Sequence, residues 1–243
     1  MALNKLQRFE AIGSFKNVLQ YPEKMPGRWK DFFGNENPLV LELACGKGEY
    51  TVGLAELHPG KNIIGVDLKG NRIYAGALEC QKKNLQNGAF LRTQIDKIDQ
   101  YFLPGEVSEI WITFPDPQLR TSRAKKRLTH PRFLRLYQNI LNTGGFIHLK
   151  TDSPALFEFT MLMADIYGLD VVDSSENVYA RPDNPPEIFI RTHYEKLDIA
   201  SSRQVFYLKF GLPEKHIPAP GRQLQELLKQ IEKRDFSRVD QKE

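Results

Sequence analysis

Short apolar runs alternate with longer mixed segments along the middle of the chain. The apolar runs have the length and the aliphatic or aromatic content of buried strands, and they are expected at 39–43, 62–66, 89–92, 110–114 and 146–150. Helical patterns lie between or after them, at 49–57, 70–87, 130–142 and 153–167. This rhythm predicts an α/β protein with a parallel sheet covered by helices on both faces.

The two ends of the chain depart from this rhythm. Residues 1–37 are polar and rich in Pro and Gly, so we expect an arm with little regular structure. The apolar run 204–210 follows no helix of crossover length, which predicts an antiparallel last strand. After Pro213, an apolar stripe predicts an amphipathic helix packed on the protein's own surface, and it consists of Leu224, Leu227, Leu228 and Ile231. We therefore divide the chain into an arm (1–37), a central domain (38–212) and an extension (213–243).

The composition is that of a globular protein. Of 243 residues, 41% are hydrophobic and 26% charged, and no apolar run is long enough to span a membrane. The N-terminus lacks the apolar core of a signal peptide. Only Cys45 and Cys80 occur, with no Cys-x-x-Cys, which argues against disulfides and zinc and indicates the cytoplasm.

The positive charge is concentrated in one segment. Seven Lys or Arg and no acidic residue lie between Arg120 and Arg135, whereas the rest of the chain is more acidic than basic. Such a patch is typical of a nucleic-acid site. A solvated helix face is the plainer alternative, but three consecutive cations at 125–127 do not fall on one helical face. Directly before this segment, Phe114-Pro-Asp116-Pro117 ends a strand, so a carboxylate lies at the edge of a cationic loop.

A second candidate site follows the first expected strand. Glu42-Leu-Ala-Cys-Gly46-Lys-Gly48 forms a strand-to-helix turn whose small residues let a ligand approach the backbone. Asp67 ends the next strand, where it can accept hydrogen bonds from both ribose hydroxyls. The three-glycine dinucleotide fingerprint is missing, which disfavours a nicotinamide dehydrogenase. Together these features favour S-adenosylmethionine over a plain turn.

Six linked motifs make a family resemblance specific. They are Glu-x-x-x-Gly-x-Gly from Glu42, Gly65-Val-Asp67, Phe-Pro-Asp-Pro, Lys126-Arg-Leu-Thr, Leu-Lys-Thr-Asp152 and Thr192-His-Tyr-Glu195. Over residues 38–212 the chain resembles the bacterial tRNA (guanine-N7)-methyltransferases. The resemblance implies a Rossmann-like class I methyltransferase fold with a mostly parallel, seven-stranded sheet. It also implies S-adenosylmethionine as cofactor, tRNA as partner, no metal, and methylation of the variable-loop guanosine at position 46 of tRNA.

The resemblance also implies roles for individual residues. The implied cofactor contacts are Glu42, Gly46, Gly48, Asp67, Gln94 and Asp116, with Asp116 also the catalytic carboxylate. The implied guanosine-site residues are Arg120, Asp152, Thr192, His193, Tyr194 and Glu195, and the implied tRNA contacts are Arg123, Lys125, Lys126 and Arg127. The chain departs from the family pattern in four places: Ala44 for a glycine, Gln94 for an acidic residue, Gln118 for a tryptophan, and Arg120-Thr-Ser-Arg123 for a Lys-Lys-Arg-His-like run.

Several features have structural alternatives. Thr192-x-x-Glu195 also fits a helix capping box, Asp152 an N-cap region, and Asp116 a turn residue. An RNA-binding protein without activity would need only the basic segment, and a methyltransferase acting on a small molecule or a protein would leave that segment idle. Both a monomer and a homodimer remain open.

Overall fold

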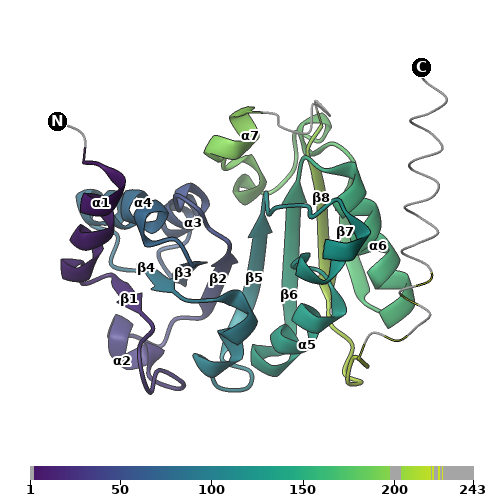
Figure 1. Cartoon of the computed structure of the whole chain (residues 1–243), viewed down its shortest axis with the longest axis horizontal. Helices are drawn as coiled ribbons and strands as arrows, with labels where there is room; N and C mark the ends of the chain where they lie inside the picture. Colours follow the sequence, from purple (N-terminus) through teal and green to yellow (C-terminus); the bar gives the residue numbers. More distant parts are fainter. Residues whose placement is uncertain (1–2, 198–203, 220, 222–223, 225, 227–243) are drawn as a thin grey trace.

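The computed structural model describes residues 3–197, 204–219, 221, 224 and 226. Within these residues eight strands form one sheet in the order β1-β4-β3-β2-β5-β6-β8-β7 (Figure 1). Every pairing from β1 to β6 is parallel, and β8 runs antiparallel to β6 and β7. The strands are β1 (Val18–Gln20), β2 (Leu39–Leu43), β3 (Asn62–Asp67), β4 (Gly88–Arg92), β5 (Val107–Thr113), β6 (Leu141–Thr151), β7 (Asp170–Ser175) and β8 (Phe206–Gly211).

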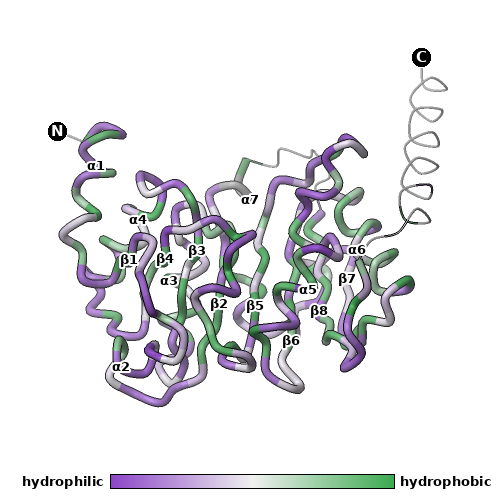
Figure 2. The backbone as a smooth tube through the Cα atoms, turned by 60° about the horizontal axis from the view of Figure 1, so that its bottom comes forward, coloured by the Kyte–Doolittle hydropathy of each residue, from purple (hydrophilic) through white to green (hydrophobic). Residues whose placement is uncertain are grey.

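Helices cover both faces of the sheet because both faces of its central strands are apolar. Along β2, Leu41 and Leu43 pack with α2 (Trp29–Phe33), α5 (Pro131–Ile140) and α6 (Pro154–Tyr167). Val40 faces the other side, toward α3 (Glu49–Leu57), and α4 (Gly70–Lys82) covers β4 on that side. In Figure 2 the central strands are accordingly largely hydrophobic. The remaining α-helices are α1 (Lys5–Ala11) and α7 (His193–Leu197).

The predicted parallel α/β sheet and its antiparallel strand near the C-terminus are confirmed. The sheet has eight strands rather than the expected seven, because β1 pairs with the outer edge of β4, with Val18 opposite Phe90. Strand β7 was also not predicted, because most of its side chains are exposed and it has no buried apolar run; it pairs with β8. Helix α4 ends at Lys82, earlier than expected, and Asn84 follows with a left-handed backbone.

The expectation that residues 1–37 have little regular structure is wrong. This segment contains α1, a 3₁₀ turn, β1 and α2. Trp29 anchors it: its side chain is fully buried, stacks on Phe102, and donates from Nε1 to the Tyr101 carbonyl at 2.8 Å. The Pro and Gly residues separate short elements, and burial of Trp29 fixes them on the sheet.

The start of the C-terminal extension packs on the protein's own core. Ile217 and Leu224 are buried in the cluster that contains α5 and α6. Gln138 of α5 donates to the carbonyls of Pro213 and Lys215 and accepts from the Ile217 N–H. The expected packing is thus confirmed for Leu224, whereas Leu227, Leu228 and Ile231 lie outside the described residues.

Candidate active site

A hollow opens where the parallel strands end, beside several of the sequence motifs. A cavity of about 960 Å³ lies beside the C-terminal ends of β2, β3, β5 and β6. In open α/β sheets this is the edge where ligands bind. The cavity brings together five of the residues predicted from the sequence: Glu42, Asp67, Asp116, Asp152 and Thr192.

Ala44 and Cys45, in the turn after β2, line one wall of the cavity. Ala44, Gly46 and Gly48 all have left-handed backbones, with φ of 59°, 57° and 74°. A side chain at Gly48 would come within 2.5 Å of the Phe90 ring, so glycine is required there for packing against β4. Alanine is small enough for position 44, but its positive φ carries a backbone cost on the order of 1 kcal/mol. The turn is therefore strained as well as narrow.

Asp67 connects this turn to the end of β3. Its Oδ2 accepts from the Gly46 N–H at 3.0 Å, and its Oδ1 accepts from the Lys69 N–H at 2.8 Å. The side chain is nearly buried but lines the cavity. Each carboxylate oxygen has a second lone pair, so the group can hold the loops and still accept from a ligand.

Glu42 lies deeper, on the cavity floor. Its Oε1 accepts from Thr113 Oγ1 at 2.7 Å, and its Oε2 accepts from the Thr51 N–H at 2.7 Å and from the Thr51 hydroxyl. Burial raises the pKa of the Glu42 carboxyl to about 7, because desolvation outweighs these hydrogen bonds. Glu42 thus joins β2, α3 and β5 directly beneath the cavity, which the sequence pattern did not reveal.

The ends of β5 and β6 carry the two further carboxylates predicted for the site, Asp116 and Asp152. Asp116 is exposed, and its Oδ1 accepts from the Gln118 N–H at 3.0 Å, so it does form the turn proposed as its structural alternative. It faces the same cavity as Asp152. Ser153, not Asp152, caps α6 by accepting from the Leu156 N–H. Asp152 immediately precedes this cap residue and lines the cavity.

The basic segment lies beside this part of the cavity. Arg120, Arg123, Lys125 and Lys126 are exposed on and before a 3₁₀ helix, η3 (Thr121–Lys126). Arg127, also predicted as a tRNA contact, differs from them: it is buried, donates to the carbonyls of Pro117, Gln118 and Leu119, and lies over the Phe159 ring. Its guanidinium shapes the loop and is not exposed for a tRNA phosphate.

Some expected site residues do not line the cavity. Among the described residues, those predicted for the site but absent from the lining are Gly46, Gly48, Gln94, Arg120, His193 and Glu195. Gln94 is exposed after β4. Thr192 does line it, and its hydroxyl accepts from the Glu195 N–H at 3.2 Å, which is one half of the predicted capping box. The Glu195 carboxylate instead binds Lys150 and Tyr179. The side chain of Tyr194 is not described.

The sequence analysis missed several residues of the site. Lys69 and Arg72 line the cavity, but nothing in their spacing distinguishes them from other surface cations. Lys150 is fully buried, and the sequence carried a signal for this: it is a lysine at the end of the largely apolar predicted strand 146–150. Two histidines, His130 and His148, have structural surroundings: His130 caps α5, and His148 stacks on Trp111 with the ring centroids 3.9 Å apart.

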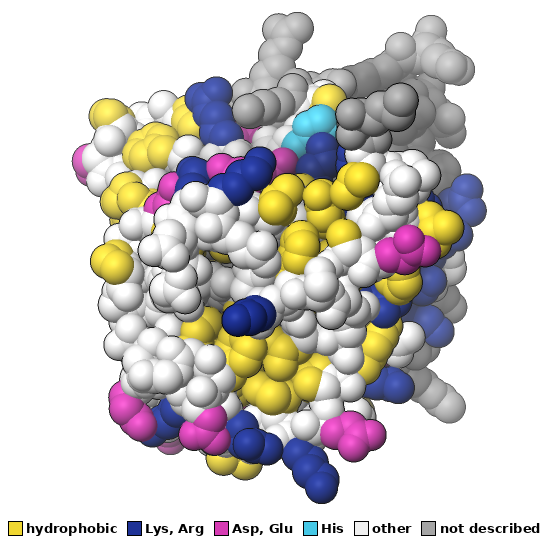
Figure 3. Space-filling model, turned by 90° about the vertical axis from the view of Figure 1, so that its left-hand side faces the viewer, with side chains coloured by type: hydrophobic (Ala, Val, Ile, Leu, Met, Phe, Trp, Pro, Cys, Tyr) yellow, Lys and Arg dark blue, Asp and Glu magenta, His cyan; other side chains and the backbone are white. Residues whose placement is uncertain are grey.

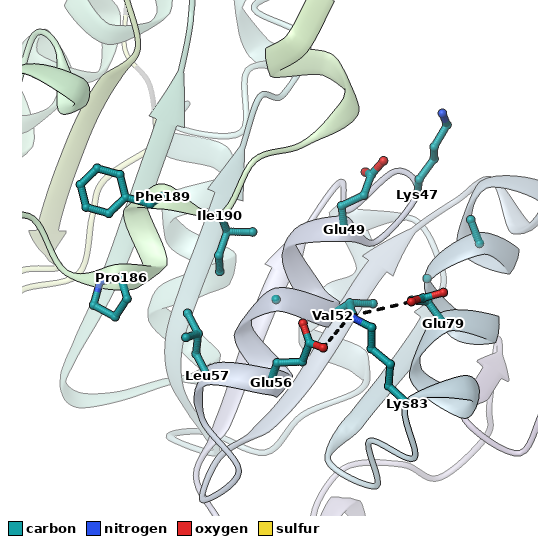
Figure 4. Close-up of a pocket in the computed structure, with 13 residues that line it drawn as sticks. Lys47, Glu49, Val52, Glu56, Leu57, Glu79, Lys83, Pro186, Phe189 and Ile190 are labelled. Carbon is teal, nitrogen blue, oxygen red and sulfur yellow. Dashed lines mark hydrogen bonds and ion pairs between the residues drawn. The ribbon is translucent and has the colours of Figure 1, made fainter.

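A second hollow of about 640 Å³ lies between α3, α4 and residues 186–190 (Figure 4). Three carboxylates line it, and Lys83 lies between two of them, Glu56 and Glu79. On the face of the molecule that includes α1, apolar patches lie between Lys and Arg side chains (Figure 3).

Among the described residues, no group of three or more His, Cys, Asp or Glu could hold a metal, and no helix is long and apolar enough to cross a membrane.

Solved structures with similar folds support the architecture. The 16S rRNA methyltransferase KamB superimposes with a TM-score of 0.57 at 16% identity, over 76% of this chain and 93% of that chain. The 16S rRNA (adenine(1408)-N(1))-methyltransferase from Catenulisporales acidiphilia gives a TM-score of 0.56 at 15% identity, over 79% of this chain and 95% of that one. These likenesses establish the Rossmann-like methyltransferase fold.

Sequence relatives are much more similar. A family model described as "Putative methyltransferase" matches residues 36–208. A protein named tRNA (guanine-N(7)-)-methyltransferase from Porphyromonas gingivalis is 46% identical, over 83% of this chain and 86% of its own length. Proteins of the same name from Bacteroides fragilis and Christiangramia forsetii are 44% and 42% identical, over 88% and 86% of this chain and 88% and 98% of their own lengths. The chain therefore belongs to the tRNA (guanine-N(7)-)-methyltransferase family.

Proposed function

We propose that this protein transfers a methyl group from S-adenosylmethionine to N7 of the variable-loop guanosine of tRNA, position 46 in tRNA numbering. One observation carries the proposal. A single cavity is lined by Asp67, Asp116 and Asp152, with exposed cations on the adjoining segment Arg120–Lys126. The names of the relatives, tRNA (guanine-N(7)-)-methyltransferase, support the same substrate.

The residues present fit the proposed cofactor. The cavity, at about 960 Å³, is large enough for a nucleoside and a second group beside it. Asp67 offers carboxylate lone pairs for ribose hydroxyls, and the turn at Gly46 has no side chain to obstruct an approach. A Catenulisporales acidiphilia enzyme with this fold is described with the cosubstrate S-adenosylmethionine. When bound, this cofactor supplies an electrophilic methyl group.

Methylation of guanine N7 makes simple demands on the protein. N7 is a lone pair with no proton to remove, so a general base is not needed. The protein must align N7 with the methyl group and stabilise the positive charge that develops on the base. Asp116 and Asp152 place carboxylates in the cavity for the second task, and Asp152 can also accept from guanine N–H donors.

The exposed cations are suited to the tRNA backbone. Arg123, Lys125 and Lys126 are solvent-exposed, and Arg120 precedes them at the start of η3. Phosphate contacts of this kind hold and orient a nucleic acid without reading its sequence. We place the tRNA on this segment, with its variable loop directed into the adjoining cavity. The proposed compartment is the cytoplasm, and Cys45 and Cys80 are both free thiols.

One experiment tests the reaction and the atom. The protein is incubated with methyl-labelled S-adenosylmethionine and either an unmodified tRNA transcript or a matched transcript with 7-deazaguanosine at position 46. We expect one methyl group per molecule in the first RNA, located by cleavage at N7-methylguanosine, and none in the second. Equal labelling of both RNAs, or a label on another base, would show that the proposed function is wrong.

A further inference from the structure

Lys150 is a buried lysine next to the candidate active site that no step of the proposed reaction uses. It lies on β6, two residues before Asp152, and its side chain is fully inaccessible to solvent. Its ammonium donates to the Ile190 carbonyl at 2.9 Å and to Glu195 Oε2 at 3.1 Å. The rings of Tyr50, Phe114 and Tyr179 surround it, with centroids 5.5 to 5.9 Å from Nζ.

A lysine in such a place has an energetic cost. Burial lowers the pKa of the Lys150 ammonium, although the adjacent Glu195 carboxylate opposes this shift. An apolar side chain of similar length could fill the space between the three rings, and buried ion pairs commonly add no net stability over such a replacement. Core packing alone therefore does not account for Lys150, whereas its two acceptors do.

Both acceptors belong to one short segment, residues 190–195. The start of this segment and the residues before it are held against α3. Tyr50 donates to the Glu187 carbonyl at 2.6 Å, and the Ile190 side chain packs so closely on Gly53 that a Cβ added at Gly53 would lie 2.8 Å from it. Figure 4 shows the Ile190 side chain directed toward α3. Lys150 contacts this segment at both ends, at the Ile190 carbonyl and at the Glu195 carboxylate, and so links it to β6.

The contacts continue from Lys150 to the cavity. Glu195 has both carboxylate oxygens engaged, Oε2 by Lys150 and Oε1 by the Tyr179 hydroxyl. Its backbone N–H in turn donates to Thr192 Oγ1 at 3.2 Å. Thr192 lines the cavity together with Asp152 and Phe114. One ammonium therefore connects β6 to the part of the cavity wall that comes from another region of the chain.

We infer that Lys150 is a positioning residue for the proposed methyl transfer. It holds residues 190–195 against β6, so that Thr192 stays on the wall of the cavity that receives the guanosine. This inference rests on the proposed function for its catalytic consequence, but the anchoring of the segment can be measured separately.

The test uses Lys150→Met, which keeps the length and apolar character of the side chain and removes its charge. Lys150→Arg is the conservative variant that keeps charge and donors. Lys61→Met is the matched control, because Lys61 also pairs with a carboxylate, Glu109, but has no contact with residues 190–195. Each variant is compared with the wild type by S-adenosylmethionine calorimetry, by kcat and KM for tRNA, and by amide hydrogen exchange.

We expect Lys150→Met to bind S-adenosylmethionine within about twofold of the wild type. Its kcat on tRNA should fall at least about tenfold, because a small displacement of an aligned group is costly. Exchange at residues 190–195 should become about tenfold faster, as expected for a locally released segment. Lys150→Arg should recover part of both effects, and Lys61→Met should match the wild type.

Unchanged exchange and unchanged kcat in folded Lys150→Met would overturn the inference, as would equal losses in Lys61→Met. If Lys150→Met does not fold, Glu195→Gln replaces it: this variant weakens the same pair and should speed exchange at residues 190–195 in the same direction. Failure of the wild type to methylate tRNA would overturn the proposed function, and the exchange measurement would still decide whether Lys150 anchors the segment.

Discussion

The Asp67 carboxylate accepts a hydrogen bond from the backbone N–H of Gly46 at 3.0 Å, joining the end of β3 to the turn after β2. The two residues are 21 positions apart in the chain. The same carboxylate also accepts from the Lys69 N–H and faces the cavity. Asp67 therefore shapes the turn beside which we place the cofactor and also provides the acceptor proposed for its ribose.

This double role gives the first prediction. Asp67→Ala should weaken S-adenosylmethionine binding by about 2–3 kcal/mol, the scale of lost charge-assisted hydrogen bonds. Asp67→Asn should lose less, because its amide oxygen can still accept from one backbone N–H. Calorimetry measures both, and tRNA affinity should stay nearly the same. The exposed Asp170 on β7 is the control position. A folded Asp67→Ala protein with wild-type cofactor affinity would remove Asp67 from the site.

The second prediction concerns Asp116. Asp116→Asn keeps the shape of the side chain and can retain the turn bond to the Gln118 N–H through its amide oxygen. It removes the negative charge from the cavity, so the rate at saturating tRNA should fall by roughly 10²-fold, the range for a lost electrostatic contact. Single-turnover kinetics separates this loss from binding. A change in tRNA affinity with an unchanged rate would contradict the assigned role.

The third prediction separates the cationic loop from the carboxylate. Changing Arg123, Lys125 and Lys126 together to Gln should weaken tRNA binding and reduce the salt slope by roughly two to three units, as expected for three phosphate contacts. The rate at saturating tRNA should change little. Binding is measured at several salt concentrations.

Arg127→Gln provides the contrast, because this residue is buried and bonded to loop carbonyls. It should lower thermal stability and leave the salt slope nearly unchanged. If Arg127→Gln reduced the salt slope of tRNA binding as much as the loss of one exposed cation does, the assignment of Arg127 to loop structure would be wrong.

The outcomes for individual residues show what the sequence could predict. The position of Asp67 at the end of a strand was predicted correctly, because the end of a parallel strand is visible in the apolar pattern. Strand β1 was missed because its three residues are only half-buried and lie among breakers. The burial of Arg127 was not predicted, because charge alone does not distinguish a solvated guanidinium from one that binds three carbonyls. The bonds of Glu42 to Thr51 and Thr113 depend on contacts across the fold, and no local pattern shows them.

The fourth prediction follows from the raised pKa of Glu42. The folded protein holds this proton up to about pH 7, whereas the unfolded chain releases it near 4.5. The stability that the folded protein has with Glu42 protonated is therefore fully present below pH 4.5, and it is lost as the pH rises through 7. At about 1.4 kcal/mol per pKa unit, the loss is on the order of 3 kcal/mol.

Glu42→Gln cannot ionise, so its stability should decline less than that of the wild type between pH 5 and 8. Urea unfolding at several pH values measures the difference. The exposed Glu176, changed to Gln, is the control and should follow the wild type. Parallel pH curves for wild type and Glu42→Gln would show that the Glu42 carboxyl ionises as readily in the fold as in the unfolded chain.

The last prediction concerns the C-terminal extension. Ile217 and Leu224 are buried in the main core, and Gln138 binds the backbone between Pro213 and Ile217. None of these residues lines the cavity. Deleting residues 214–243 should therefore expose apolar core surface and lower the thermal stability, or change the oligomeric state, while the folded protein still methylates tRNA.

Leu224→Ala isolates the packing contribution within the full-length chain. It should lower the free energy of unfolding by about 2–4 kcal/mol, the usual cost of removing a buried leucine side chain, with kcat and KM for tRNA unchanged. Glu226→Ala, at an exposed position two residues later, should change neither quantity. Leu224 packs in the core, whereas the cavity lies at the C-terminal ends of the strands, so this substitution should lower stability without lowering activity. A Leu224→Ala protein that unfolds like the wild type but no longer binds tRNA would show that the extension contributes to RNA binding and not to the core.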